Sequence, residues 1–157
     1  MEIILLGTGT PNPSLKRQSS GYLVEIGADT LVFDHGAGAH HRLMEAGRRA
    51  VDVDYLFLSH LHSDHCLDYA RLIHTRWDQG AGNVPELVVY GPSYTARMTD
   101  LLFGDQGVFE PDLAARTQYP GSLAFMKPAA EFRPGGGRSR WSRLCSTVRS
   151  SREMTGG

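Results

Sequence analysis

The chain has 157 residues, the length of a single domain, and its 41% hydrophobic and 21% charged residues are typical of a soluble globular protein. Its formal net charge is −1, and no apolar run approaches the roughly 18 residues that a membrane-spanning helix needs. Two cysteines are too few for a disulfide framework, so the composition predicts a cytoplasmic protein without a membrane segment.

Charge is unevenly divided along the chain. Residues 1–132 contain ten Lys and Arg but sixteen Asp and Glu, a formal charge of −6, whereas residues 133–157 contain six Arg and one Glu, a formal charge of +5. The second segment is rich in Gly, Ser and Arg and has neither helix nor strand periodicity, which predicts disorder. Two alternatives stay open: a basic arm for RNA, or a segment translated out of frame. We therefore predict a domain over 1–132 and a tail over 133–157.

The first part of the chain has the pattern of β-structure. Glu2–Leu6 is predicted to be a buried strand, and a loop rich in Gly and Pro follows it. Two runs of β-branched and aromatic residues, 22–26 and 30–33, flank a turn that contains Gly27, which is a hairpin signal. Asp34 follows the second run directly.

Helices and strands are predicted to alternate in the remainder. Apolar spacing indicates a helix over 39–46, on which His40 and His41 are expected to be solvated, and a second helix after His65 that reaches Trp77. Further expected elements are a strand over 86–90, a helix over 94–103 with Ser93 as its N-cap, a helical turn over 110–113 and a strand over 123–126.

The densest group of polar side chains follows the apolar run Tyr55–Leu58, which is predicted to be a central strand. Strand side chains alternate between faces, so His60 and His62 are expected to project the same way. A turn after them would bring Asp64 and His65 round to the same place. Neutral imidazole and carboxylate are ligands that zinc takes, and manganese or iron are alternatives. The spacing predicts a metal site.

This pattern, His-x-His-x-Asp-His after an apolar strand, resembles the signature loop of the metallo-β-lactamase fold hydrolases. The N-terminal sequence is similar to their ribonuclease Z and arylsulfatase-like branch. The resemblance covers about residues 1–130. It implies an α/β fold, an αβ/βα sandwich with helices outside the sheets, of which this chain would hold only the first αβ half.

The resemblance also implies roles for individual residues. His60 and His62 would bind one ion, and Asp64 and His65 would bind a second. Asp64 would also be the catalytic residue, which orients the attacking water or accepts its proton. Asp34 matches an aspartate that holds the loop through hydrogen bonds, so it is expected to orient ligands rather than to bind metal. A simple turn aspartate is the alternative.

The later ligands of that family are not visible in this sequence, because no histidine follows His74. His74 itself lies nine positions after His65, which on a helix is the opposite side, so we assign it no role. Four ligands shared between two ions leave each short of the usual zinc shell of about four. A single, weakly held metal is therefore expected rather than a formed pair.

Three functional hypotheses follow. The first is a metal-dependent hydrolase that acts on a phosphodiester, as in RNA 3′-processing, or on a related small ester. The second is a catalytically silent fragment that keeps partial metal binding, and the third is an iron-dependent oxidoreductase on the same fold. The open inner face of a half-sandwich would also need a cover, which self-association into a homo-oligomer would supply.

Overall fold

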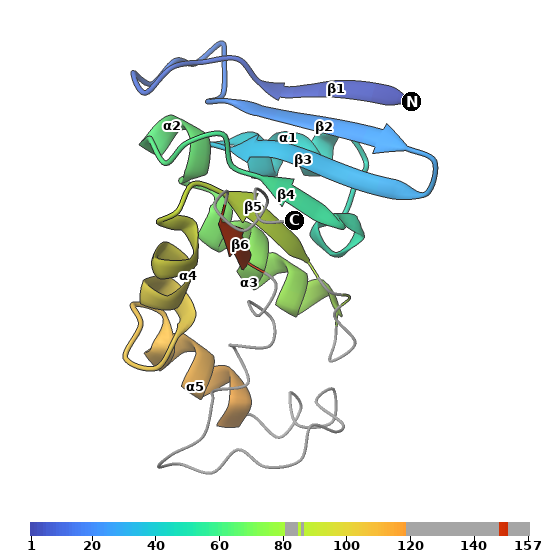
Figure 1. Ribbon diagram of the computed structural model, residues 1–157. Helices are drawn as coiled ribbons and strands as arrows, with labels where there is room; N and C mark the ends of the chain where they lie inside the picture. Colours follow the sequence, from blue (N-terminus) through green and yellow to red (C-terminus); the bar gives the residue numbers. More distant parts are fainter. Residues whose placement is uncertain (81–84, 86, 119–147, 151–157) are drawn as a thin grey trace, which may run out of the picture.

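Six strands form one sheet in the order β1-β2-β3-β4-β5-β6 in the computed structural model, which describes residues 1–80, 85, 87–118 and 148–150 (Figure 1). The first three strands pair antiparallel, and each later strand pairs parallel with its predecessor. The elements in chain order are β1 (Glu2–Gly7), β2 (Gly21–Ile26), β3 (Asp29–His35), α1 (Ala39–Glu45), the 3-10 turn η1 (Ala50–Asp52), β4 (Tyr55–Phe57), α2 (Ser63–Cys66), α3 (Tyr69–Gly80), β5 (Val88–Gly91), α4 (Thr95–Phe103), α5 (Glu110–Gln118) and β6 (Val148–Ser150).

The parallel pairs dictate where the helices lie. A parallel strand needs a crossover connection, and α1 with η1 joins β3 to β4 while α2 with α3 joins β4 to β5. Figure 1 shows α1 and α3 behind the sheet, on one face of it. The core lies between that face and these helices, and it includes Leu6, Leu23, Val32, Leu43, Leu56, Tyr69, Leu72, Val89 and Phe103.

The opposite face of the sheet is apolar and partly exposed. Strand alternation sends every second side chain to it, and register aligns them in two rows across five strands. In one row the rings of Phe33, Phe57 and Tyr90 stack with centroids 4.8 and 4.9 Å apart. Ile3 and Leu5 on β1 are 57% and 63% exposed. We call these two rows, which are Leu5, Tyr22, Phe33, Phe57, Tyr90 and Ile3, Val24, Leu31, Tyr55, Val88, the open face.

The α/β order expected from the sequence is confirmed, but several local expectations are wrong. The strand expected to be buried, Glu2–Leu6, lies in the edge strand β1 and is mostly exposed, and the helix expected after His65 is divided into α2 and α3. The central strand ends at Phe57 rather than Leu58, because the Ser59 N–H turns to a carboxylate instead of continuing the ladder. Ser93 does not cap α4: the N-cap is Tyr94, and the carbonyl of Pro92 accepts the Thr95 N–H. The turn predicted from residue 110 extends into the nine-residue α5.

Two expected segments fall mainly outside the described residues. The strand over 123–126 lies wholly outside them. Of the tail over 133–157 the structure describes only β6, which pairs with β5. The division of the chain at residue 132 therefore stays a prediction. Within the described ranges, no helix combines the length and the apolar character needed to cross a bilayer.

Candidate metal site

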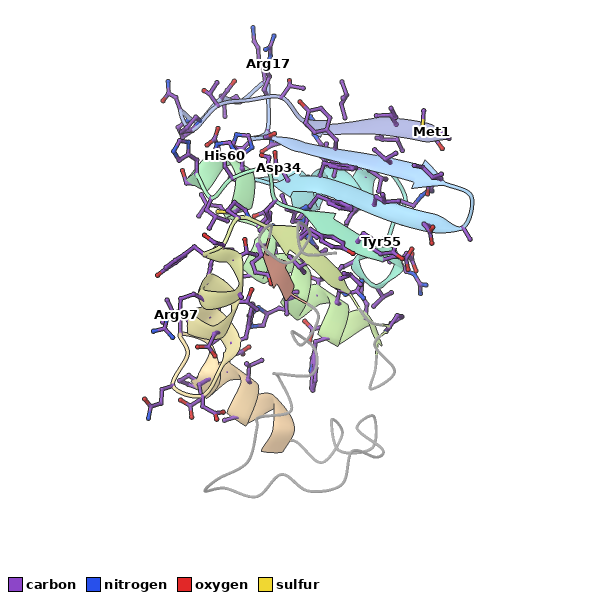
Figure 2. The ribbon with its side chains drawn as sticks, in the orientation of Figure 1. Met1, Arg17, Asp34, Tyr55, His60 and Arg97 are labelled. Atoms are coloured by element: carbon purple, nitrogen blue, oxygen red, sulfur yellow. The ribbon has the colours of Figure 1, made fainter. Side chains whose placement is uncertain are left out.

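The four predicted ligands lie just beyond the carboxyl end of β4. His60 and His62 are on the loop that leaves this strand, and Asp64 and His65 are on α2. Figure 2 shows His60 beside Asp34, at the end of the sheet where β3 finishes. Parallel neighbours β3 and β4 have their carboxyl ends at the same edge, which is why residues about 25 positions apart in sequence meet here.

Asp34 is the central acceptor of this region. It is 5% exposed, and its φ of 57° lies in the left-handed region, which costs a non-glycine residue about 1–3 kcal/mol. Its Oδ1 accepts the Ser59 N–H at 2.8 Å, and both carboxylate oxygens lie 2.9 Å from Ser59 Oγ. The Ser20 hydroxyl donates to Oδ2 at 3.4 Å. These bonds hold the carboxylate in place despite its strained backbone.

His65 is tied to the same carboxylate. Its Nδ1 lies 2.7 Å from Asp34 Oδ2, and because a carboxylate only accepts, Nδ1 carries the proton. The other ring nitrogen, Nε2, then presents a lone pair when the imidazole is neutral. It lies 3.4 Å from Asp64 Oδ2, so two acceptors face each other with no proton between them.

The backbone carbonyl of Asp64 is fixed by two contacts. It is 7% exposed, and its carbonyl accepts the Ser20 N–H at 3.0 Å. Gly36 packs against the same carbonyl, so closely that a Cβ built on it would lie 1.9 Å from Asp64 O. Ser20 also donates to Asp34, so it joins both carboxylate residues. Neither Ser20 nor the Gly36 contact was assigned a role from the sequence, because only folding brings these segments together.

The structure brings together the three histidine rings of the motif, two from the loop and one from α2. His60 Nε2 lies 3.2 Å from His62 Nδ1, and the His60 and His65 ring centroids are 3.9 Å apart. His60 and His62 do meet, although they lie on a loop and not on the strand that the sequence predicts for them. Within the described ranges, no three His, Cys, Asp or Glu side chains form a finished metal cage.

The donor set nevertheless fits a divalent cation. Imidazole nitrogens and a carboxylate are ligands of zinc and of similar ions. Among the described residues, Asp64 Oδ1 is buried without a hydrogen-bond partner, which is costly for a carboxylate oxygen. A cation beside it would satisfy this oxygen, and would also remove the lone-pair repulsion between Asp64 Oδ2 and His65 Nε2.

A second histidine pair lies behind the site. His35 and His40 are 0% and 1% exposed, and His35 Nε2 lies 3.3 Å from His40 Nδ1. Burial, with the positive charge of Arg71 as a further cause, lowers the pKa of His35 to about 3 and also lowers that of His40. Both rings are therefore neutral at pH 7. The expectation of a solvated His40 is wrong, whereas His41 is exposed.

Cys66 and His74 lie near the four predicted ligands but are bonded to other groups. Burial raises the pKa of the Cys66 thiol, whose Sγ donates to the carbonyl of His62 at 3.3 Å, so this cysteine is neutral at pH 7. His74 faces α4 and α5: its Nε2 is 3.3 Å from Asp112 Oδ2, and its ring packs on Phe103 and Phe109. His74 therefore faces away from the four predicted ligands, as expected from its helical position relative to His65.

Residues 15–141 match the metallo-beta-lactamase superfamily, and the chain belongs to that family. Among curated proteins it is similar to ribonuclease Z of Mycolicibacterium gilvum, with 38% identity over 101 residues that cover 64% of this chain and 35% of the relative. It is also similar to ribonuclease Z of a Mycobacterium strain, with 34% identity over 122 residues that cover 73% of this chain and 43% of the relative. The chain thus spans less than half the length of these relatives.

Solved structures give the same family. The chain is similar to human tRNase Z, short form, with a TM-score of 0.56 and 28% identity, over 67% of this chain and 40% of that one. It is also similar to the metallo-beta-lactamase fold protein YhfI from Bacillus subtilis, with a TM-score of 0.55 and 25% identity, over 63% of this chain and 40% of that one. The expected family and α/β fold are therefore confirmed.

Proposed function

We propose that this chain supplies the metal-binding loop of a metal-dependent phosphodiester hydrolase that acts on RNA. The observation that carries the proposal is a run of contacts in which the His60 ring meets the rings of His62 and His65, and His65 Nε2 lies 3.4 Å from Asp64 Oδ2. The buried Oδ1 of Asp64 has no hydrogen-bond partner among the described residues. Relatives named ribonuclease Z and tRNase Z support RNA as the substrate. A small ester is the neighbouring substrate class.

His60, His62, Asp64 and His65 would hold the metal, and zinc is the ion that this donor set fits best, with manganese or iron as alternatives. Bound zinc would supply a nucleophile at neutral pH, because a divalent cation lowers the pKa of a water molecule that it holds. Asp64 would be the catalytic residue, because a carboxylate oxygen at this place can orient that water or accept its proton. Asp34 would orient His65.

The test combines metal analysis with hydrolysis of bis(p-nitrophenyl) phosphate and of a 3′-extended transfer RNA. His62→Ala should abolish metal binding, because it removes a proposed ligand. His41→Ala is the matched control, since His41 is exposed on α1 and its Nε2 lies 3.1 Å from Glu45 Oε1. Bound zinc with turnover supports the proposal.

Other outcomes decide between the remaining hypotheses. Metal binding without turnover would mean a catalytically silent chain, and bound iron with oxygen consumption would mean an oxidoreductase. A chain that binds no divalent transition ion at neutral pH would overturn all three. Turnover of the small ester but not of the RNA would keep the hydrolase and remove RNA as the substrate.

Self-association into a homo-oligomer stays a prediction. The open face is free of charged side chains in its two rows, and contact between two such faces would bury their rings. Sedimentation velocity over a range of concentrations measures it directly. A sedimentation coefficient that does not change with concentration, at the value for a 17.3 kDa chain, would contradict it.

A further inference from the structure

Ser59 stands between the Asp34 carboxylate and the His60 ring. Its Oγ lies 2.9 Å from each carboxylate oxygen of Asp34 and 3.0 Å from His60 Nδ1. A serine hydroxyl has one proton to donate and lone pairs with which to accept. The position of that single proton decides the protonation of the neighbouring imidazole.

The proton of Ser59 must point to Asp34. If it pointed to His60, the lone pairs of Oγ would face two carboxylate oxygens at 2.9 Å with no hydrogen between them. Because a carboxylate only accepts, and hydrogen bonds to charged groups are about twice as strong as neutral ones, the donation to Asp34 prevails. His60 Nδ1 must then carry the proton that Ser59 Oγ accepts.

The same carboxylate therefore fixes two imidazoles. The Nδ1–H of His65 donates a hydrogen bond directly to Asp34. The Nδ1–H of His60 donates a hydrogen bond to Ser59 Oγ, whose own hydroxyl proton points to Asp34. In both rings Nε2 is left as the bare nitrogen. At His60 this nitrogen lies 3.2 Å from His62 Nδ1, so in the absence of metal it accepts a hydrogen bond from the Nδ1–H of that ring.

We propose that Ser59 is a positioning residue, which relays the charge of Asp34 to His60 and holds that ring as the Nδ1–H tautomer with Nε2 free to bind metal. The inference rests on the proposed metal site for its purpose, but the tautomer itself is a property of the metal-free chain. Removal of the Ser59 hydroxyl should leave the loop in place, because the Ser59 N–H binds Asp34 independently of the hydroxyl.

The experiment reads the tautomer by long-range ¹H–¹⁵N correlation NMR on the ¹⁵N-labelled, metal-free chain at a pH of about 8.5, above the titration range of free imidazole. His60→Gln assigns the signals. Wild-type protein and Ser59→Thr should show a protonated Nδ1 and a bare Nε2 at His60. Ser59→Ala should move His60 to a mixture in which Nε2–H predominates. Ser93→Ala, an exposed serine at the start of α4, is the control and should leave the His60 signals unchanged.

A second readout follows zinc affinity by competition with a chelating dye. Ser59→Ala should weaken zinc binding by about tenfold, the lower end of the range for residues that orient a ligand, and Ser59→Thr should restore it. A wild-type His60 with its proton on Nε2 would overturn the inference, and so would a Ser59→Ala spectrum identical to wild type. Should Ser59→Ala not fold, the wild-type and Ser59→Thr spectra still decide. A chain that shows the expected tautomer but binds no zinc would refute the proposed function alone.

Discussion

Asp34 Oδ2 and His65 Nδ1 lie 2.7 Å apart and join the carboxyl end of β3 to α2. Asp34 is 5% exposed and the side chain of His65 is 20% exposed, so water competes little for this bond. The bond sets which nitrogen of His65 is protonated and turns the other toward Asp64. The orientation of the proposed ligands therefore depends on a residue that need not touch the metal.

Asp34→Asn tests that dependence. Asparagine tolerates the left-handed backbone of this position, so the change removes charge and one acceptor with little added strain. One of its two acceptor sites becomes an NH₂ group that faces the donors of Ser59 and His65. We expect a loss of about 1–3 kcal/mol in the free energy of unfolding and a 10–100-fold loss of zinc affinity. Urea denaturation and dye competition measure these. Asp29→Asn, at the exposed hairpin turn, should change neither.

Gly36→Ala tests the close approach of two backbones. The added Cβ would lie 1.9 Å from Asp64 O, an atom that cannot swing aside as a flexible side chain would. We expect a loss of about 1–3 kcal/mol in the free energy of unfolding, together with weaker zinc binding, because Asp64 must shift. Gly27→Asn is the control: Gly27 has a φ of +63° with open space around it, and Asn accepts such a turn. Equal stability of the two variants would contradict the prediction.

The His35–His40 pair predicts loss of stability in mild acid. Both rings have a lowered pKa in the folded chain, to about 3 for His35, whereas an unfolded histidine titrates near 6.5. Below that pH the unfolded state binds more protons, so the stability present above about pH 6.5 falls as pH decreases toward the folded values. Each group contributes a slope of up to about 1.4 kcal/mol per pH unit.

Urea denaturation at several pH values between 7.5 and 4.5 measures that slope. His35→Gln should flatten it, because one titrating group is removed, although the variant is less stable at pH 7.5. The groups that act on the pair, Arg71, Asp68 and His41, stay in place in this variant. Ser93→Ala, at an exposed position before α4, should keep the wild-type slope. A wild-type stability that is constant over this range would show that the two rings do not titrate as stated.

The open face predicts binding of an apolar fluorescent probe. Phe33 is 37% exposed and begins the stack with Phe57 and Tyr90, so the face presents aromatic surface to solvent. We expect the folded chain to enhance the fluorescence of anilinonaphthalene sulfonate, and Phe33→Ser to reduce this enhancement. Leu101→Ser removes a side chain that is 41% exposed on α4, away from the two rows, and should leave it unchanged. The same loss in both variants would mean that the probe binds elsewhere.

Local patterns in the sequence determined much of this protein. The hairpin around Gly27, the helix up to Trp77 and the spacing from His60 to His65 are all set by residues close together in the chain, and periodicity and motif predict them. The superfamily follows from the same motif. The end of the central strand was misplaced by one residue, because the acceptor that turns the Ser59 N–H away from the ladder is Asp34, 25 positions earlier.

Only the tertiary structure decided how the proposed ligands are oriented and which histidines are buried. Ser20, which lies just before β2, holds Asp64 and Asp34, and His40 is buried against His35 rather than solvated. Such contacts join positions between 5 and 44 residues apart, and their energy depends on burial and on exact distance. Neither quantity can be read from residue type, because each arises only when the sheet and its helices exclude water from the groups between them.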